Sequence, residues 1–240
     1  MLPKLEYPVY ETKIPSNGKT VKYRPFLVKE HRMLMKAIEF NDETNLIETF
    51  KNLIKACVLT DVDVDKLAMF DVDWLYLKIK GVSTGSVNQV KYKCNHVGAD
   101  GAACGNSVLV NLDTEQAVLN VPDSLNTIMV GKDVGVKMRY PTFEDYIRNG
   151  RAQSLIELTE EFVLDCIESV FDKEAIYTPG VDFTREDLRE FVNGFTNEAS
   201  EKITEFVENI PQLEMKMDIR CPKCGNHDVI HLRGIDDFLE

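Results

Sequence analysis

The chain has 240 residues, of which 44% are hydrophobic and 28% charged, and its formal net charge is −12. This composition predicts a globular protein with one large or two small domains and differs from that of a disordered chain. The negative charge disfavours a nucleic-acid ligand, and the lack of a signal-peptide core or of an apolar run of roughly 20 residues predicts a cytoplasmic protein with no membrane partner.

The N-terminal region predicts a β-hairpin followed by helices. Two β-rich runs, residues 7–14 and 20–24, flank a Pro-Ser-Asn-Gly-Lys turn whose Asn-Gly pair tolerates positive φ. Apolar residues then recur at helical spacing from Phe26 to Ile38, over residues 42–58, and over residues 67–80. We therefore expect three helices, the last ended by the glycines that follow it.

The central region predicts strands. The expected strands are residues 87–93, 107–112, 127–130 and 135–140, with a glycine-rich insertion at 95–103. The last third returns to helical patterns at residues 143–149 and 152–171, and in a pair between 185 and 209 that bends near Gly194. Thr184 and Asp187 resemble a capping box, Pro211 ends the last helix, and residues 213–219 and 228–232 form a closing hairpin.

These elements predict an α+β fold. Residues 1–86 are expected to form an N-terminal β-hairpin and a helical block, and residues 87–141 a central β region. Residues 142–240 are expected to form a C-terminal helical block closed by a zinc-ribbon-like hairpin. The alternative is one compact domain that contains all three segments.

The six cysteines are too sparse for a disulfide scaffold, so their spacing decides between metal binding and burial. One pattern occurs twice: a strand ends at Cys94 and resumes after Cys104-Gly105-Asn106, and another ends at Cys221 and resumes after Cys224-Gly225-Asn226. Zinc prefers four ligands in a tetrahedron, and a Cys-x-x-Cys turn supplies two of them. We therefore predict one structural zinc per chain, bound by Cys94, Cys104, Cys221 and Cys224.

Alternatives to this zinc site remain open. The two hairpins could carry reduced cysteines without metal, or a mixed site could use His96, His227 or His231, which are otherwise expected at the surface. Cys57 and Cys166 each lie in an apolar stripe at helical spacing, where a thiol behaves as a small core side chain. Four cysteine ligands would also leave no open coordination position, so the predicted metal is not catalytic.

No other motif predicts catalysis or a small-molecule substrate. Gly81-Val82-Ser83-Thr84-Gly85 matches the pattern of a hydrolase elbow, but a helix precedes it and a strand follows, the reverse of the required order. Asp61, Asp63 and Asp65 resemble the start of a calcium loop, but the sixth position is Lys66 and the twelfth is Val72. We expect a protein that is not an enzyme and acts through its surfaces.

Several strings resemble the baseplate-hub protein family of T-even-like phages. The strings at the beginning are Leu2-Pro3-Lys4-Leu5, the turn at 14–19, residues 23–30 and residues 33–37. Those at the end are Ile203 with Phe206, residues 209–213, the Cys221 turn and residues 232–238. In the aromatic and cationic cluster Tyr23-Arg24-Pro25-Phe26, aromatic residues favour a junction core over a partner contact.

The resemblance implies a structural or assembly component of a contractile tail, whose partners are other baseplate hub and tail proteins. It also implies a place in the host cytoplasm during assembly and in the tail baseplate of the virion. One alternative is an assembly chaperone that acts on the tape-measure protein and is absent from the virion. A second is a zinc-ribbon adaptor in transcription, which the acidity of the chain disfavours.

Overall fold

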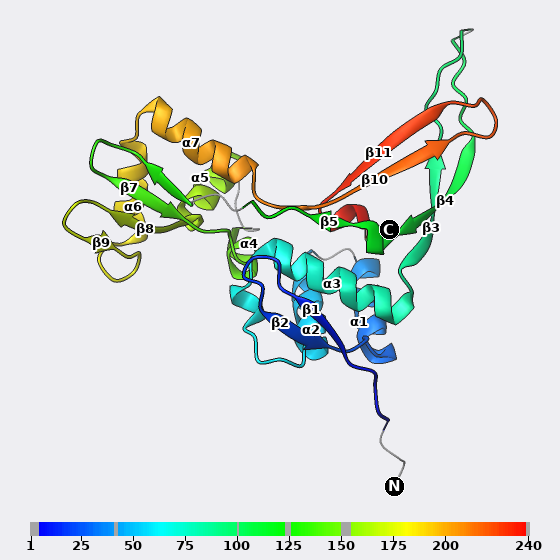
Figure 1. Ribbon diagram of the computed structural model, residues 1–240, viewed down its shortest axis with the longest axis horizontal. Helices are drawn as coiled ribbons and strands as arrows, with labels where there is room; N and C mark the ends of the chain where they lie inside the picture. Colours follow the sequence, from blue (N-terminus) through cyan, green and yellow to red (C-terminus); the bar gives the residue numbers. More distant parts are fainter. Residues whose placement is uncertain (1–4, 41–42, 100, 123–125, 150–154, 239–240) are drawn as a thin grey trace. The chain divides into compact units, whose positions relative to one another are not determined.

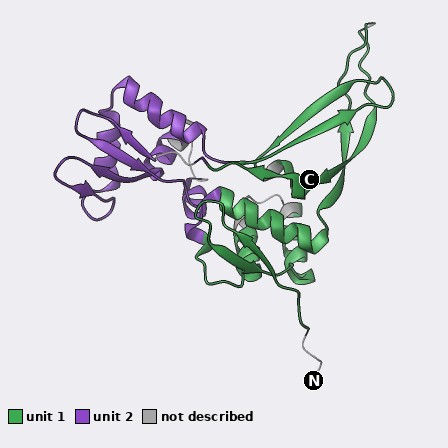
Figure 2. Ribbon diagram, viewed as in Figure 1, with its two compact units in different colours: residues 1–64, 70–121, 212–240 green, residues 65–69, 122–211 purple. Residues whose placement is uncertain are grey.

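The computed structural model describes residues 5–40, 43–99, 101–122, 126–149 and 155–238, which form two compact units (Figure 2). Unit 1 takes its residues from 1–64, 70–121 and 212–240, and unit 2 from 65–69 and 122–211. Both units combine helices with small antiparallel sheets, so the predicted α+β class is confirmed. The division differs from the three consecutive segments predicted above, because the C-terminal hairpin belongs to unit 1 and the helices before it to unit 2.

Unit 1 begins with the predicted hairpin, in which β1 (Tyr10–Lys13) pairs with β2 (Thr20–Tyr23). The helices α1 (Val28–Phe40), α2 (Glu43–Cys57) and α3 (Met69–Thr84) follow (Figure 1). α3 continues through Gly81 and ends before Gly85, whose φ of +94° L side chains rarely adopt. Among the described helices, none combines the length and apolar character that a membrane span needs.

The junction between the hairpin and α1 is held by an ion pair. Both guanidinium nitrogens of Arg24 donate to the two carboxylate oxygens of Glu30, at 3.0 and 2.8 Å, and the Leu27 N–H donates to Glu30 at 2.5 Å. The Glu30 side chain is only 6% exposed. Tyr23 is buried, and the ring of Phe26 stacks on His31 at 5.6 Å. The Tyr23-Arg24-Pro25-Phe26 cluster therefore lies at the junction between the hairpin and α1, in the core arrangement that its aromatic residues predicted.

Two long hairpins of unit 1 pack face to face. β3 (Val87–Lys93) pairs with β4 (Ser107–Asp113), and β10 (Leu213–Arg220) pairs with β11 (His227–Arg233) and with the short edge strand β5 (Val118–Leu119). Side chains alternate between core and solvent, as a half-buried sheet requires. The core side chains between the hairpins are Val90, Val108, Val110, Leu112, Met215, Met217, Ile219, Ile230 and Leu232, with fully buried Phe238. At the far end, the Tyr92 hydroxyl donates to Asp228 and links the hairpins.

The described part of unit 2 combines four helices with a four-stranded antiparallel sheet. Its strands lie in the order β6 (Thr127–Met129), β7 (Gly135–Met138), β8 (Ile167–Phe171) and β9 (Ile176–Tyr177). The helices are α4 (Phe143–Asn149), α5 (Leu155–Asp165), α6 (Arg185–Asn193) and α7 (Asn197–Glu208). The capping box predicted at Thr184 and Asp187 is present, and the helix pair breaks at Gly194 as expected.

The prediction of one helix over residues 152–171 is wrong in its second half. Residues 152–154 lie outside the described residues, α5 ends at Asp165, and β8 begins at Ile167. Val170 pairs with Val136 of β7, so the apolar residues of this stretch serve a sheet and a helix in turn. Cys166 lies between the two elements and not within a helix, but it is fully buried, as predicted.

Buried carboxylates join the helices of unit 2. The side chain of Asp165 is 1% exposed and accepts hydrogen bonds from Arg148 at 2.5 Å, Arg185 at 2.7 Å and Asn149 at 2.9 Å. Asp145 accepts from Arg139 at 2.7 Å and caps its own helix through Thr142. Burial alone would raise the pKa of Asp145, but the hydrogen bonds from Arg139 and Thr142 hold it below its ordinary value.

Candidate metal centre

The two long hairpins of unit 1 bring their cysteines to the same place. Cys94 directly follows β3 and Cys104 lies shortly before β4, whereas Cys221 directly follows β10 and Cys224 lies shortly before β11. The four Sγ atoms all lie within 4.8 Å of one another. Residues separated by 117 and 130 positions in the chain thus meet at one point.

The two turns have the same backbone structure. The Cys94 N–H donates to Asn106 O at 2.9 Å and the Gly105 N–H donates to Cys94 O at 3.1 Å. The corresponding bonds of the second turn, from Cys221 to Asn226 and from Gly225 to Cys221, measure 2.8 and 2.9 Å. Gly105 and Gly225 both have positive φ, at +59° and +72°. The repeat read in the sequence is therefore a repeat of backbone geometry.

The glycine-rich insertion is accommodated outside this geometry. The Cys104 N–H donates to His96 O at 2.8 Å, and the Gly98 N–H donates to Ala102 O at 2.9 Å, so the extra residues form a small turn of their own. The nine-residue separation of Cys94 and Cys104 consequently does not keep their sulfurs from the other pair.

The sulfur distances fit a tetrahedral ion. Four ligands at about 2.3 Å from a central zinc would lie about 3.8 Å from one another. Cys94 Sγ lies 3.7 Å from Cys224 Sγ, and Cys104 Sγ lies 3.8 Å from Cys221 Sγ. None of these cysteines forms a disulfide, which would require about 2.05 Å between sulfurs. The four thiols could therefore bind a metal ion.

The surroundings of the thiols favour a thiolate at Cys221. Backbone N–H groups of Cys224 and Lys223 lower the pKa of Cys221 to about 6, outweighing the effect of burial. Cys94 accepts from the N–H of His96, but burial and the neighbouring thiols outweigh that bond and raise its pKa to about 12. Crowded thiols without a cation oppose one another's ionisation, which is the situation that a divalent ion relieves.

Two further polar side chains surround the centre. The amide nitrogen of Asn106 lies 3.6 Å from Cys221 Sγ, and Lys223 Nζ donates to Cys104 O at 3.3 Å. These roles were not predicted from the sequence, although the repeated Cys-Gly-Asn string includes Asn106. Both contacts run between the two hairpins, so they hold one turn against the other.

The remaining candidate residues lie elsewhere. His96, His227 and His231 are exposed, and none belongs to the four-cysteine group. Cys57 and Cys166 are fully buried, and burial raises their pKa to about 11 and about 12. Neither belongs to the described metal-ligand group, and both pack in cores, as predicted.

The hydrolase-like string is part of a helix end. Ser83 Oγ donates to Ile79 O at 2.5 Å and accepts the Phe26 N–H at 3.0 Å. The hydroxyl therefore ties the last turn of α3 to the chain segment that enters α1. α3 precedes the end of this string and β3 follows it, which is the order expected from the sequence.

Comparisons with known proteins agree with the resemblance noted in the sequence. Residues 7–240 match the family described as T4 bacteriophage base plate protein. The chain is also similar to the baseplate hub assembly protein gp26 of Enterobacteria phage T4, with 23% identity over 234 residues that cover 96% of this chain and 98% of that relative. No solved structure matches. A structural role in a phage baseplate follows, and the chain belongs to the T4 bacteriophage base plate protein family.

Proposed function

We propose that the chain acts in assembly of the baseplate hub, by contacts with other proteins of the contractile tail. The observation that carries this proposal is the similarity to a hub assembly protein over 98% of the relative's length, which leaves little of either chain unmatched. The function would reside in surfaces, with the partners being other hub and tail proteins of the same phage.

The four-cysteine centre would hold one structural zinc ion per chain. Its ligands would be Cys94, Cys104, Cys221 and Cys224, whose sulfur separations of 3.7 and 3.8 Å support tetrahedral binding. Four sulfur ligands fill such a coordination sphere and leave no position for a water or substrate. The ion would therefore supply cohesion between two hairpins and no chemistry.

Co-expression tests the assembly role. The tagged full chain is expressed together with the other hub proteins of its phage, and complexes are separated by size and identified by mass spectrometry. We expect one or more hub proteins to co-purify, and a phage lacking this gene to regain baseplates when the chain is supplied in trans. Independent migration of the chain, together with normal baseplates in its absence, would contradict the proposal.

Elemental analysis tests the zinc. We expect close to one zinc per chain in the wild type and in Cys57→Ser, which removes a core thiol outside the centre. Cys221→Ser combined with Cys224→Ser should contain none. Equal zinc content in the double variant and the wild type would contradict the assignment.

A further inference from the structure

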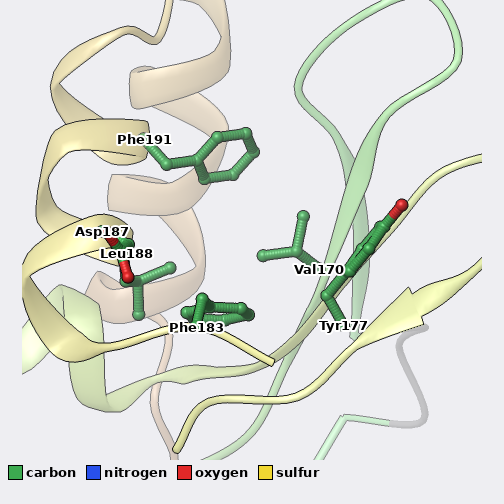
Figure 3. A pocket seen from close by; sticks show the side chains of 6 residues that line it. All are labelled: Val170, Tyr177, Phe183, Asp187, Leu188 and Phe191. Atoms are coloured by element: carbon green, nitrogen blue, oxygen red, sulfur yellow. The ribbon is translucent and has the colours of Figure 1, made fainter. Parts of the chain in front are cut away.

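An apolar pocket opens in unit 2 between the sheet and α6. It has a volume of about 220 Å³ and is lined by Val170, Tyr177, Phe183, Asp187, Leu188 and Phe191 (Figure 3). Val170 and Tyr177 come from β8 and β9, and Leu188 and Phe191 from α6. Asp187 contributes the one carboxylate, which is already bound by the N–H and hydroxyl of Thr184 at 2.8 and 2.7 Å.

The size and lining of the pocket fit one large apolar side chain. Sites for small molecules usually measure about 300–1,000 Å³ and place several polar groups toward the ligand. This pocket is smaller and offers hydrocarbon and aromatic surface instead. Binding energy in protein interfaces is concentrated in such places, where one aromatic or aliphatic side chain is fully desolvated.

One apolar lining residue of the pocket is itself open to solvent. Tyr177 is 37% exposed, and its ring lies on the same face of the sheet as Val170, with which it pairs. β9 pairs with β8 on one side and is the last strand of the described sheet. An isolated exposed apolar residue is ordinary, but an exposed ring that lines an apolar pocket offers surface that another chain can cover.

The charge around this surface is negative. Asp172 accepts the Tyr177 hydroxyl at 3.1 Å, and Asp182 accepts the Thr178 N–H at 2.8 Å, so both carboxylates lie next to lining residues. The neighbouring cations are already paired: Arg185 with Glu161 and Asp165, Arg189 with Glu161 and Glu186, and Lys173 with Asp133. Unit 2 as a whole has 20 Asp and Glu against 10 Lys and Arg, and so carries −10 of the net charge of −12.

We propose that this surface binds a basic segment of a partner protein, which inserts one large apolar side chain into the pocket and places Lys or Arg beside it. Charge complementarity selects this occupant, because an acidic rim repels acidic segments and attracts cations. The inference rests on the proposed function and deepens it by giving the chemistry of the partner. The exposed carboxylates bind the Lys or Arg side chains of the partner segment, and the pocket binds its large apolar side chain.

Defined peptides test the chemistry directly. Binding of the peptides Lys-Lys-Phe-Lys-Lys, Lys-Lys-Ala-Lys-Lys and Glu-Glu-Phe-Glu-Glu to the full chain is followed by NMR chemical shifts. We expect the first to shift signals of Val170, Leu188 and Phe191, and the other two to bind at least tenfold more weakly. Binding should also weaken several-fold between 50 and 300 mM salt. Equal binding of all three peptides, or no binding by the first, would overturn the proposal.

Surface variants keep the fold intact while altering the pocket mouth. Tyr177→Asp, at the exposed lining residue, should weaken the basic peptide about tenfold, and separately Asp182→Asn, which keeps an acceptor oxygen for the Thr178 N–H, should weaken it several-fold. Leu109→Asp, at a residue of unit 1 that is 62% exposed, and Glu201→Gln, at an exposed residue of α7, are matched controls expected to bind as the wild type does. Control variants that lose as much binding as the pocket variants would contradict the assignment.

The same variants separate this inference from the proposed function. If the wild type and the Tyr177→Asp variant co-purify equally well with hub proteins, the pocket is not the docking site, although the assembly role stands. If the basic peptide binds, but no hub protein co-purifies and baseplates form normally without the chain, the pocket stands and the assembly role fails. A concentration-dependent dimer in sedimentation that the pocket variants abolish would show a second copy as the occupant, and would overturn the proposal.

Discussion

Removal of the proposed zinc should destabilise unit 1 and leave unit 2 unchanged. The ion would cross-link Cys104 and Cys221, which are 117 residues apart. For a loop of that length, the chain-entropy model of cross-links gives a stabilisation of about 5 kcal/mol. For a unit of this size, that corresponds to a melting temperature lower by about 10–20 °C. The expected stabilisation is large because the two cysteines are far apart in sequence, and a cross-link that closes a short loop stabilises the fold less.

Calorimetry of the zinc-loaded and chelator-treated chain measures this effect, because two units can melt as two transitions. We expect one transition to fall and to recover when zinc is returned, and the other to stay within about 1 °C. The double variant Cys221→Ser with Cys224→Ser should match the chelated protein and should not respond to zinc. An unchanged melting profile after verified metal loss would refute the idea that the ion ties the hairpins together.

Three further predictions concern packing and buried charge. Glu30→Gln removes the partner of Arg24 at a pair with side chains 6% and 13% exposed, and should cost about 2–3 kcal/mol in urea unfolding. Phe238→Ala empties a fully buried site of unit 1 and should cost about 3–4 kcal/mol in the same assay. Lowering the pH should destabilise both units. Hydrogen bonds from Arg24 and Leu27 outweigh the effect of burial and hold the pKa of Glu30 below its ordinary 4.5. Hydrogen bonds from Arg139 and Thr142 likewise hold the pKa of Asp145 below its ordinary 3.8. These contributions are complete above those ordinary values and are lost as the pH falls through the lower, folded-state values.

Matched variants make these predictions specific. Glu11→Gln breaks an exposed pair with Lys22 and should change stability by less than about 0.5 kcal/mol. Phe238→Leu keeps most of the volume and should cost about 1 kcal/mol. Glu30→Gln should remove part of the acid dependence of unit 1. A Glu30→Gln protein with the wild-type pH profile and the wild-type urea midpoint would show that the ion pair contributes nothing.

The four-cysteine group was predictable because each half is a local structure. A strand that ends in Cys and resumes after Cys-Gly-Asn needs one glycine with positive φ, and both turns have it, at Gly105 and Gly225. Local strings specify such turns well, because the backbone bonds involved span only a few residues. The repeat also predicted that the two halves meet, but it did not identify the side chains that pack between the hairpins, such as Met217 and Val110.

Two features escaped the sequence because apolar spacing alone is ambiguous. Residues 162–170 place apolar side chains at positions that fit a helix. Ile167 and Val170 nevertheless pair with β7, a strand that lies some 30 residues earlier in the chain. The pocket beside α6 also left no local sign. Its lining comes from residues 170–191, and only the packing of α6 on the sheet brings Phe191 toward Tyr177.

The path of the chain through unit 1 has a consequence for synthesis on the ribosome. Leu119 of β5 pairs with Leu213 of β10, and unit 2 is made almost entirely between these two residues. At about 5–20 residues per second, roughly 6–23 s separate translation of Cys104 from that of Cys221. During that interval the apolar side of the β3–β4 hairpin is uncovered, while the ribosome synthesises unit 2. A nascent chain that stops before its last 30 residues lacks β10 and β11, so that surface stays uncovered. Chaperones or proteases would then bind the chain before any tail protein does.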